Sequence, residues 1–230
     1  MDGPPNELKQ VSIGGLSGTT VYEDRLLRPR VEPWERDLDA DGEPDGLIVG
    51  LRDEPRRPRS VFFSCSGDRT SVVVSDNKYG FGVADDLGAP NRLMTWQDGF
   101  QQREELLNIY HYDSQVPPII VRLEAGKIVD ATVEFESWYT EIARDALANV
   151  TDSDRRVIAS APPDKFERFD RGVARGKFLR AIVALIYARR ATEAREVLDR
   201  DYPGEDRAAF WEAIRRSVSE STIVLDPMPW

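Results

Sequence analysis

The sequence predicts an α+β protein in which a mostly antiparallel β unit precedes a helical bundle. Before residue 138, short runs of β-branched and aromatic residues alternate with turn residues, which is typical of strands and hairpins. After residue 138, apolar residues recur every three or four positions, as they do on the buried face of a helix. We therefore expect two regions, a β-rich one over residues 1–137 and a helical one over residues 138–230.

Turn residues separate the strand-like segments of the first region. Ser66-Gly67-Asp68 predicts a hairpin, and Ala125-Gly126-Lys127 joins the last pair of strands. A segment rich in Gln and Glu, residues 98–108, is expected to form a short helix. The expected strands are residues 19–22, 46–51, 60–64, 70–74, 118–123 and 127–135.

The second region has the spacing of amphipathic helices. One begins near Tyr139, and Ser160-Ala-Pro-Pro163 interrupts the chain before the next, over residues 166–190. Two more are expected over residues 193–200 and 208–218, separated by Tyr202-Pro203-Gly204.

Residues 178–203 resemble a degenerate tetratricopeptide-like helix hairpin. The small residues Ala181, Ala184, Ala188 and Ala194 would allow two helices to pack closely. The segment occurs once and lacks the Trp-Leu-Gly signature of such repeats. An ordinary helical bundle packed on the β unit is the favoured alternative.

An acidic loop carries the clearest chemical signal. Asp37, Asp39 and Asp41 alternate along the chain, Gly42 permits a sharp turn, and Asp45 follows before the apolar run of residues 47–49. Ca²⁺ takes six to eight oxygen ligands, so carboxylates at positions 1, 3 and 5 of a curled loop can converge on one ion. The Glu43 carbonyl at position 7 and Asp45 at position 9 complete the predicted ligand set. An acidic surface turn is the alternative.

The segment after the loop distinguishes two kinds of calcium site. An EF-hand needs a glutamate at position 12 and flanking helices, but Ile48 stands there and a strand is expected. The pattern instead resembles the calcium loops of FG-GAP/VCBS-type β repeats, D-x-D-x-D-G-x-x-D followed by a short apolar strand. This resemblance implies Ca²⁺ as the cofactor and Asp37, Asp39, Asp41, the Glu43 carbonyl and Asp45 as ligands. The pattern occurs once and without a 20–50-residue period, so a propeller is not predicted.

The net charge and the hydropathy of the sequence limit the classes of molecule that the protein is expected to bind. The net charge of −10 argues against nucleic-acid binding, because it leaves phosphate repulsion uncompensated over most of the surface. The one basic cluster, Arg56-Arg57-Pro58-Arg59, is interpreted as a solvated loop. The apolar run of residues 181–188 is too short to span a membrane and has flanking arginines.

The expected location is outside the cytoplasm, in the periplasm or at the cell surface. Calcium is millimolar outside cells, which suits a loop of this kind. The segment from Val121 to Tyr139 is also similar to a hairpin of bacterial exported proteins that carry such loops. The first residues lack the basic and apolar regions of a signal peptide. The single Cys65 cannot form an internal disulfide.

Catalytic signatures are weak. His111 is the single histidine, and with one cysteine the chain cannot supply an ordinary zinc ligand set. No Gly-x-Ser-x-Gly elbow, phosphate loop or dinucleotide fingerprint occurs. We therefore expect a non-enzymatic calcium-binding module that binds or assembles with a protein or polysaccharide. A hydrolase that uses a carboxylate pair, with calcium structural, is the alternative.

Three tryptophans offer aromatic surface to such a partner. They are Trp34, Trp96 and Trp230. Aromatic side chains can anchor partner or carbohydrate contacts, although packing in the core is their commoner role.

Overall fold

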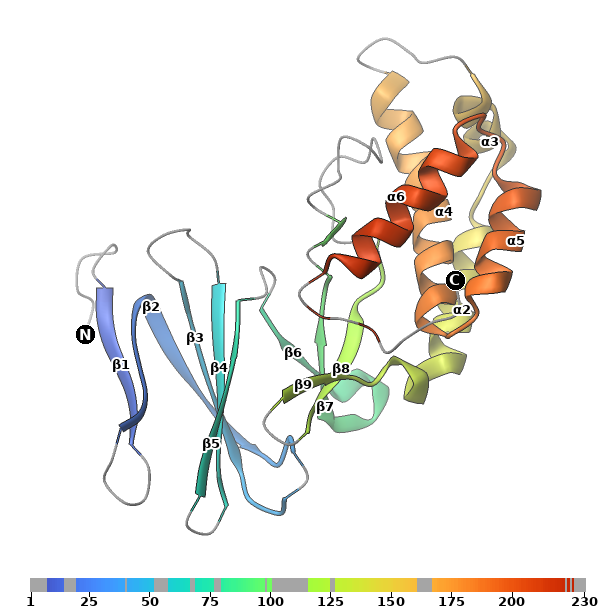
Figure 1. The fold of residues 1–230 in the computed structure, drawn as a ribbon. Helices are drawn as coiled ribbons and strands as arrows, with labels where there is room; N and C mark the ends of the chain where they lie inside the picture. The colour runs from blue at the N-terminus through green and yellow to red at the C-terminus, as the bar shows by residue number, and fades with distance from the viewer. Residues whose placement is uncertain are drawn as a thin grey trace. The chain divides into compact units, whose positions relative to one another are not determined.

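The computed structural model has an α+β fold, as predicted (Figure 1). Strands dominate the N-terminal half and helices the C-terminal part of the chain. The structure describes residues 8–14, 20–39, 41–51, 58–66, 69–76, 80–97, 99–100, 116–124, 127–160, 167–221, 223 and 225.

The first sheet is an antiparallel meander in which each strand pairs with its neighbour along the chain. Its strand order is therefore β1-β2-β3-β4-β5, as Figure 1 shows. The strands are β1 (Leu8–Gly14), β2 (Thr20–Arg36), β3 (Asp45–Leu51), β4 (Pro58–Ser66) and β5 (Arg69–Ser75). The strands expected at residues 46–51, 60–64 and 70–74 are confirmed.

Strand β2 is much longer than the predicted segment 19–22. Its pairing with β3 shifts between Leu27 and Arg30, and again between Pro33 and Arg36. Proline has no N–H to donate to a ladder, and each shift lies beside or includes a proline, Pro29 or Pro33. Because this strand contains prolines and charged residues, it lacks the apolar alternation by which a strand is predicted. Bulges accommodate these residues in the sheet.

The core of this sheet gathers one face of four strands. Ile13, Leu26, Ile48 and Val61 are buried together, and Phe63 and Val72 pack against them. On the other face the buried Phe62 ring meets Phe81 edge to face, with centroids 5.2 Å apart. The sheet therefore buries apolar residues on both faces of β4, which explains the near-continuous apolar run Val61-Phe62-Phe63.

A second sheet has the order β6-β7-β8-β9. Its strands are β6 (Gly82–Ala84), β7 (Ala89–Thr95), β8 (Ile119–Glu124) and β9 (Lys127–Asp130). Strands β6 and β7 are antiparallel and flank the short 3₁₀-helix η1 (Asp85–Leu87), and Gly88 follows η1 with φ +67°. Neither strand was predicted, because β6 is three residues long and β7 contains proline and asparagine.

Two sequence predictions, for residues 127–135 and 98–108, differ in outcome from the strands confirmed above. The strand expected over residues 127–135 ends at Asp130, and the 3₁₀-helix η3 (Thr132–Phe135) follows. The buried Asp130 carboxylate accepts a hydrogen bond from the Thr132 N–H (2.8 Å), which turns the backbone out of the strand. The short helix expected over residues 98–108 lies mostly outside the described residues.

The helical part contains α2 (Glu136–Ala148), α3 (Asp152–Ala159), α4 (Glu167–Tyr187), α5 (Ala191–Asp201) and α6 (Arg207–Ser219). The four predicted helices correspond to α2, α4, α5 and α6, and α3 was not predicted. Helix α4 packs against α2, α3 and α5 (Figure 1). Its residues 181–187 are all buried, so the C-terminal half of α4 is a central core helix rather than an amphipathic one.

The chain folds into two compact units. One comprises residues 1–95 and 120–129, and the other residues 96–119 and 130–230. The chain thus passes from one unit to the other three times, whereas the sequence suggested one boundary after residue 137. Of the helices described, none combines the length and the apolar character needed to cross a membrane.

Candidate metal centre

The acidic loop connects β2 to β3 at one end of the first sheet. Strand β2 ends at Arg36 and β3 begins at Asp45, and these two residues are paired across the strands. The loop therefore starts and ends at neighbouring positions. This register brings Asp37 close to Asp45, although eight positions separate them in the sequence.

Backbone N–H groups of the loop point at its own carboxylates. Asp37 accepts through both oxygens, Oδ1 from the Asp41 N–H (2.9 Å) and Oδ2 from the Gly42 N–H (2.8 Å). The Asp41 N–H also lies 3.3 Å from Asp39 Oδ1. These hydrogen bonds offset part of the repulsion between neighbouring carboxylates. A carboxylate oxygen that accepts one hydrogen bond keeps a second lone pair for a cation.

Asp45 is held differently, inside the protein. Its side chain is 4% exposed, and its Oδ2 accepts a hydrogen bond from the Leu38 N–H at 2.5 Å. Leu38 is itself 1% exposed. The loop is thus attached to the fold through the buried pair Leu38 and Asp45, while residues 41–44 are exposed.

Two glycines shape this segment for different reasons. Gly42 has φ +93°, a conformation that a residue with a side chain rarely adopts. Gly46 pairs with Phe63 of β4, and a Cβ placed on Gly46 would lie 2.1 Å from the Phe63 Cζ. The bare backbone of Gly46 therefore lets the Phe63 ring cover the start of β3, next to Asp45.

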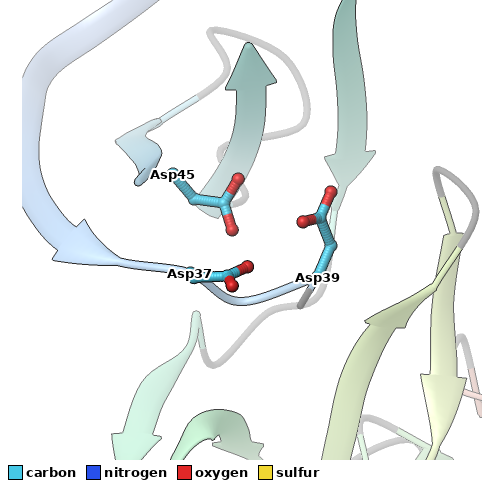
Figure 2. Close-up of side chains that lie close together, drawn as sticks. All are labelled: Asp37, Asp39 and Asp45. Carbon is cyan, nitrogen blue, oxygen red and sulfur yellow. The ribbon is translucent and has the colours of Figure 1, made fainter. Parts of the chain in front are cut away.

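Three carboxylates converge at this end of the sheet. Asp37, Asp39 and Asp45 each offer an oxygen, and these oxygens lie within 4.8 Å of one another (Figure 2). Asp37 and Asp39 are half-buried and Asp45 is buried. Carboxylate oxygens are ligands for hard cations such as Ca²⁺, and three of them carry enough negative charge to compensate a divalent ion. The residues present therefore fit a divalent cation.

The group contains three of the five predicted ligand residues. The Asp41 carboxylate accepts a hydrogen bond from the Glu43 N–H (2.9 Å), and both residues are exposed. The assignment of Asp41 and of the Glu43 carbonyl as ligands remains a prediction. The sequence interpretation overlooked Leu38, whose buried side chain and N–H hold the loop; an apolar residue between two loop aspartates was the available signal.

Arg59 belongs to the basic cluster predicted from the sequence, and it is engaged within the fold. Arg59 is ion-paired with Asp76 (Nε to Oδ1, 2.6 Å) and with Asp24. Hydrogen bonds to Asp76, and then to Asp24, raise the pKa of Arg59 above its ordinary value. The positive charge of Arg59 is therefore balanced by two carboxylates of the same protein. His111 and Trp230 lie outside the described residues, as do the side chains of Cys65 and Trp34, while Trp96 is half-buried.

Comparison with known proteins does not assign the chain. No protein-family model matches it, and neither a curated protein nor a solved structure shows a significant match.

Proposed function

We propose that this is a calcium-binding, non-enzymatic protein in which Ca²⁺ orders the loop between β2 and β3. The observation that carries the proposal is the convergence of Asp37, Asp39 and Asp45 oxygens within 4.8 Å of one another. The alternating aspartates with Gly42 in the turn support it independently, because they match the ligand spacing of a known kind of calcium loop.

The chemistry of the donor set favours Ca²⁺ over other common cations. All three side chains offer oxygen, whereas structural zinc prefers histidine and cysteine. Mg²⁺ requires near-ideal octahedral geometry and retains several waters, while Ca²⁺ accepts six to eight oxygens in flexible arrangements. A loop whose backbone already curls around its carboxylates suits the larger ion. The Glu43 carbonyl, Asp41 and water are the proposed remaining ligands.

We further propose that the protein acts outside the cytoplasm as a binding or assembly module. Loops of this kind suit compartments in which calcium is millimolar. Calcium would stabilise the connection between β2 and β3, and Leu47 and Ile48 of β3 belong to the buried interior. A protein or polysaccharide is the proposed partner, and calcium would keep the partner-binding fold stable rather than take part in chemistry.

Thermal unfolding of chelator-treated protein tests the calcium site. An ion that binds only the folded state stabilises it by about 2.7 kcal/mol when its concentration is 100 times the dissociation constant. For a chain of this size that corresponds to a rise in Tm of about 5–10 °C. We expect this rise when Ca²⁺ is present at about 100 times its dissociation constant, and a much smaller rise in Mg²⁺ at the same concentration.

Matched variants assign the effect to the loop. Asp39→Asn removes one charged ligand, and Asp86→Asn removes the same charge from an exposed turn elsewhere. We expect Asp39→Asn to lose most of the calcium-dependent rise while its Tm in chelator stays near that of the wild type. Asp86→Asn should keep the full rise. Equal calcium responses in the wild type and Asp39→Asn would disprove the site.

A further inference from the structure

Arginine side chains gather around the turn between α5 and α6. Arg155 of α3 donates a hydrogen bond to the Asp201 carbonyl (Nη1 to O, 2.7 Å). Arg207 of α6 donates to the Tyr202 carbonyl from both Nε (3.2 Å) and Nη2 (2.8 Å). The Asp201 carboxylate is itself paired with Arg200 (2.7 Å). A carbonyl oxygen satisfies a donor but carries no formal negative charge, so the charges of Arg155 and Arg207 are not balanced here.

Two more arginines reach this turn from α4. Arg171 and Arg175 stand four positions apart, so their side chains leave the same face of that helix. Arg175 forms an ion pair with Asp206, the residue before α6 (Nη1 to Oδ2, 3.0 Å). Burial raises the pKa of Tyr202 above its ordinary value, and the positive charges of Arg175 and Arg171 oppose that rise. Both guanidinium groups thus act on the same buried hydroxyl.

Arg175 is a buried charge with incomplete hydrogen bonding. Its side chain is 4% exposed, and its guanidinium carbon lies 4.8 Å from the centroid of the Phe210 ring. Asp206 is shared, because its Oδ1 accepts a hydrogen bond from the Tyr202 hydroxyl (3.1 Å). The Nε of Arg175 has no hydrogen-bond partner among the described residues. A buried donor without an acceptor is costly, and a bound ion is one of its ordinary explanations.

Arg171 has fewer contacts than Arg175. Its Nε is also buried without a hydrogen-bond partner in the described part of the chain, and its Nη1 lies 3.4 Å from the Ser160 carbonyl, a long contact. Of the four arginines from α3, α4 and α6, Arg175 alone forms an ion pair with a described residue. The group therefore concentrates positive charge in a protein whose net charge is −10.

We propose that Arg171 and Arg175 hold a small oxyanion of the phosphate class. Guanidinium forks match the oxygens of phosphate and carboxylate, and two of them favour the doubly charged phosphate over a singly charged carboxylate. Arg171 and Asp206 are half-buried, so solvent reaches the rim of the group while Arg175 lies at its base. The net charge of −10 disfavours a polyanion. The proposed ligand is therefore free phosphate or the phosphate ester of a small molecule.

Calorimetric titration of the full chain with inorganic phosphate tests the site. Chelator is present throughout, so the result is independent of the calcium proposal, and chloride at equal ionic strength is the blank. Arg171→Gln removes a guanidinium from the proposed site, whereas Arg144→Gln removes the same charge from α2, where the side chain is 69% exposed. We expect saturable binding that Arg171→Gln weakens about tenfold, because charge-assisted hydrogen bonds are lost. Arg144→Gln should bind as the wild type does.

Asp206→Asn should change the affinity in the opposite direction. It removes the carboxylate that repels an anion and that occupies Nη1 of Arg175, so phosphate should bind more tightly than to the wild type. An ionic strength of about 0.15 M screens the effect of more distant charges. If the arginines served only to hold α4 against the turn, Asp206→Asn would not increase the affinity for phosphate.

Glycerol 3-phosphate, titrated in the same way, distinguishes the two sources of the phosphate group. Tighter binding of this ester than of inorganic phosphate supports a small phosphorylated molecule as the ligand, and the reverse order supports free phosphate. Concentrations up to about 10 mM cover dissociation constants up to about 1 mM. The proposal is overturned if neither compound binds over this range, or if Arg171→Gln and Arg144→Gln bind phosphate equally well.

Discussion

Gly46 illustrates how a single residue without a side chain supports the candidate metal centre. It follows Asp45 directly and pairs with Phe63 across β3 and β4. Phe63 packs against the buried cluster of Ile13, Leu26, Ile48 and Val61. The ring therefore connects the first residues of β3 to the core, and it lies where any Cβ on residue 46 would be.

Gly46→Ala should destabilise the protein. The added Cβ would lie 2.1 Å from the Phe63 Cζ, so the ring must move away from the core. Overpacking of this kind typically costs about 1–3 kcal/mol. Urea unfolding measures the loss. Gly82→Ala is the control, because nothing lies within 4 Å of a Cβ there, although it too is a strand glycine. Equal costs for the two substitutions would contradict the role of Phe63.

At the scale of elements, α3 shows how a short helix is stabilised at its beginning. Thr151 and Asp154 form a reciprocal capping box, in which the Thr151 Oγ1 accepts from the Asp154 N–H and Asp154 Oδ2 accepts from the Thr151 N–H. Lys177 of α4 also donates to Asp154 Oδ2 (2.7 Å). The same carboxylate thus caps α3 and attaches it to the central helix.

The pKa of Asp154 reflects these contacts. Burial alone would raise it, but the hydrogen bonds from Lys177 and Thr151 outweigh burial and lower the pKa below its ordinary value. The folded-state pKa therefore lies below the unfolded value of about 3.9. Ionised Asp154 stabilises the fold above that pH, and this contribution is lost as the pH falls through the folded-state pKa.

Asp154→Asn should reduce stability at neutral pH and make it less sensitive to acid. Loss of the charge-assisted hydrogen bond to Lys177 should cost on the order of 1 kcal/mol at pH 7. The difference from the wild type should shrink as the pH falls below about 3.9, because the wild-type carboxylate then becomes protonated as well. Urea unfolding at several pH values measures both effects.

Asp152→Asn is the matched control for this prediction. It removes the same charge from the same helical turn at an exposed residue, so it accounts for the general effect of charge at a helix N-terminus. It should cost less than Asp154→Asn at pH 7. If the two variants lose the same stability, the contact with Lys177 contributes nothing.

At the scale of the whole molecule, the candidate metal centre belongs to one of two compact units. The unit of residues 1–95 and 120–129 contains the acidic loop, and the unit of residues 96–119 and 130–230 contains α4. Each unit has buried apolar residues of its own, including the cluster around Ile48 in the first and residues 181–188 in the second. An ion bound in the loop should therefore stabilise the first unit preferentially.

Hydrogen exchange with and without calcium tests this division. If Ca²⁺ is present at 100 times its dissociation constant, amides of β2 and β3 that exchange by opening of the ion-binding unit should slow about 100-fold. Amides of α4 should exchange at the same rate in both conditions. Equal slowing in β3 and α4 would show that the two units open together.

Local patterns predicted much of the fold. Strand β3 and helices α5 and α6 follow from apolar spacing and from the turns beside them. The full length of β2 did not, because its prolines and charges are tolerated through pairing shifts against β3. Helix α3 was also missed, although its capping residues Thr151 and Asp154 stand three positions apart in the sequence.

The sequence by itself determined the α+β class and the position of the acidic loop, because both depend on residue types at short, regular spacing. Which carboxylates converge was decided by the tertiary structure. The pairing of Arg36 with Asp45 closes the loop, and burial of Leu38 and Asp45 holds its two ends together. Strand register and burial depend on residues far apart in the chain, and spacing within nine residues does not encode them.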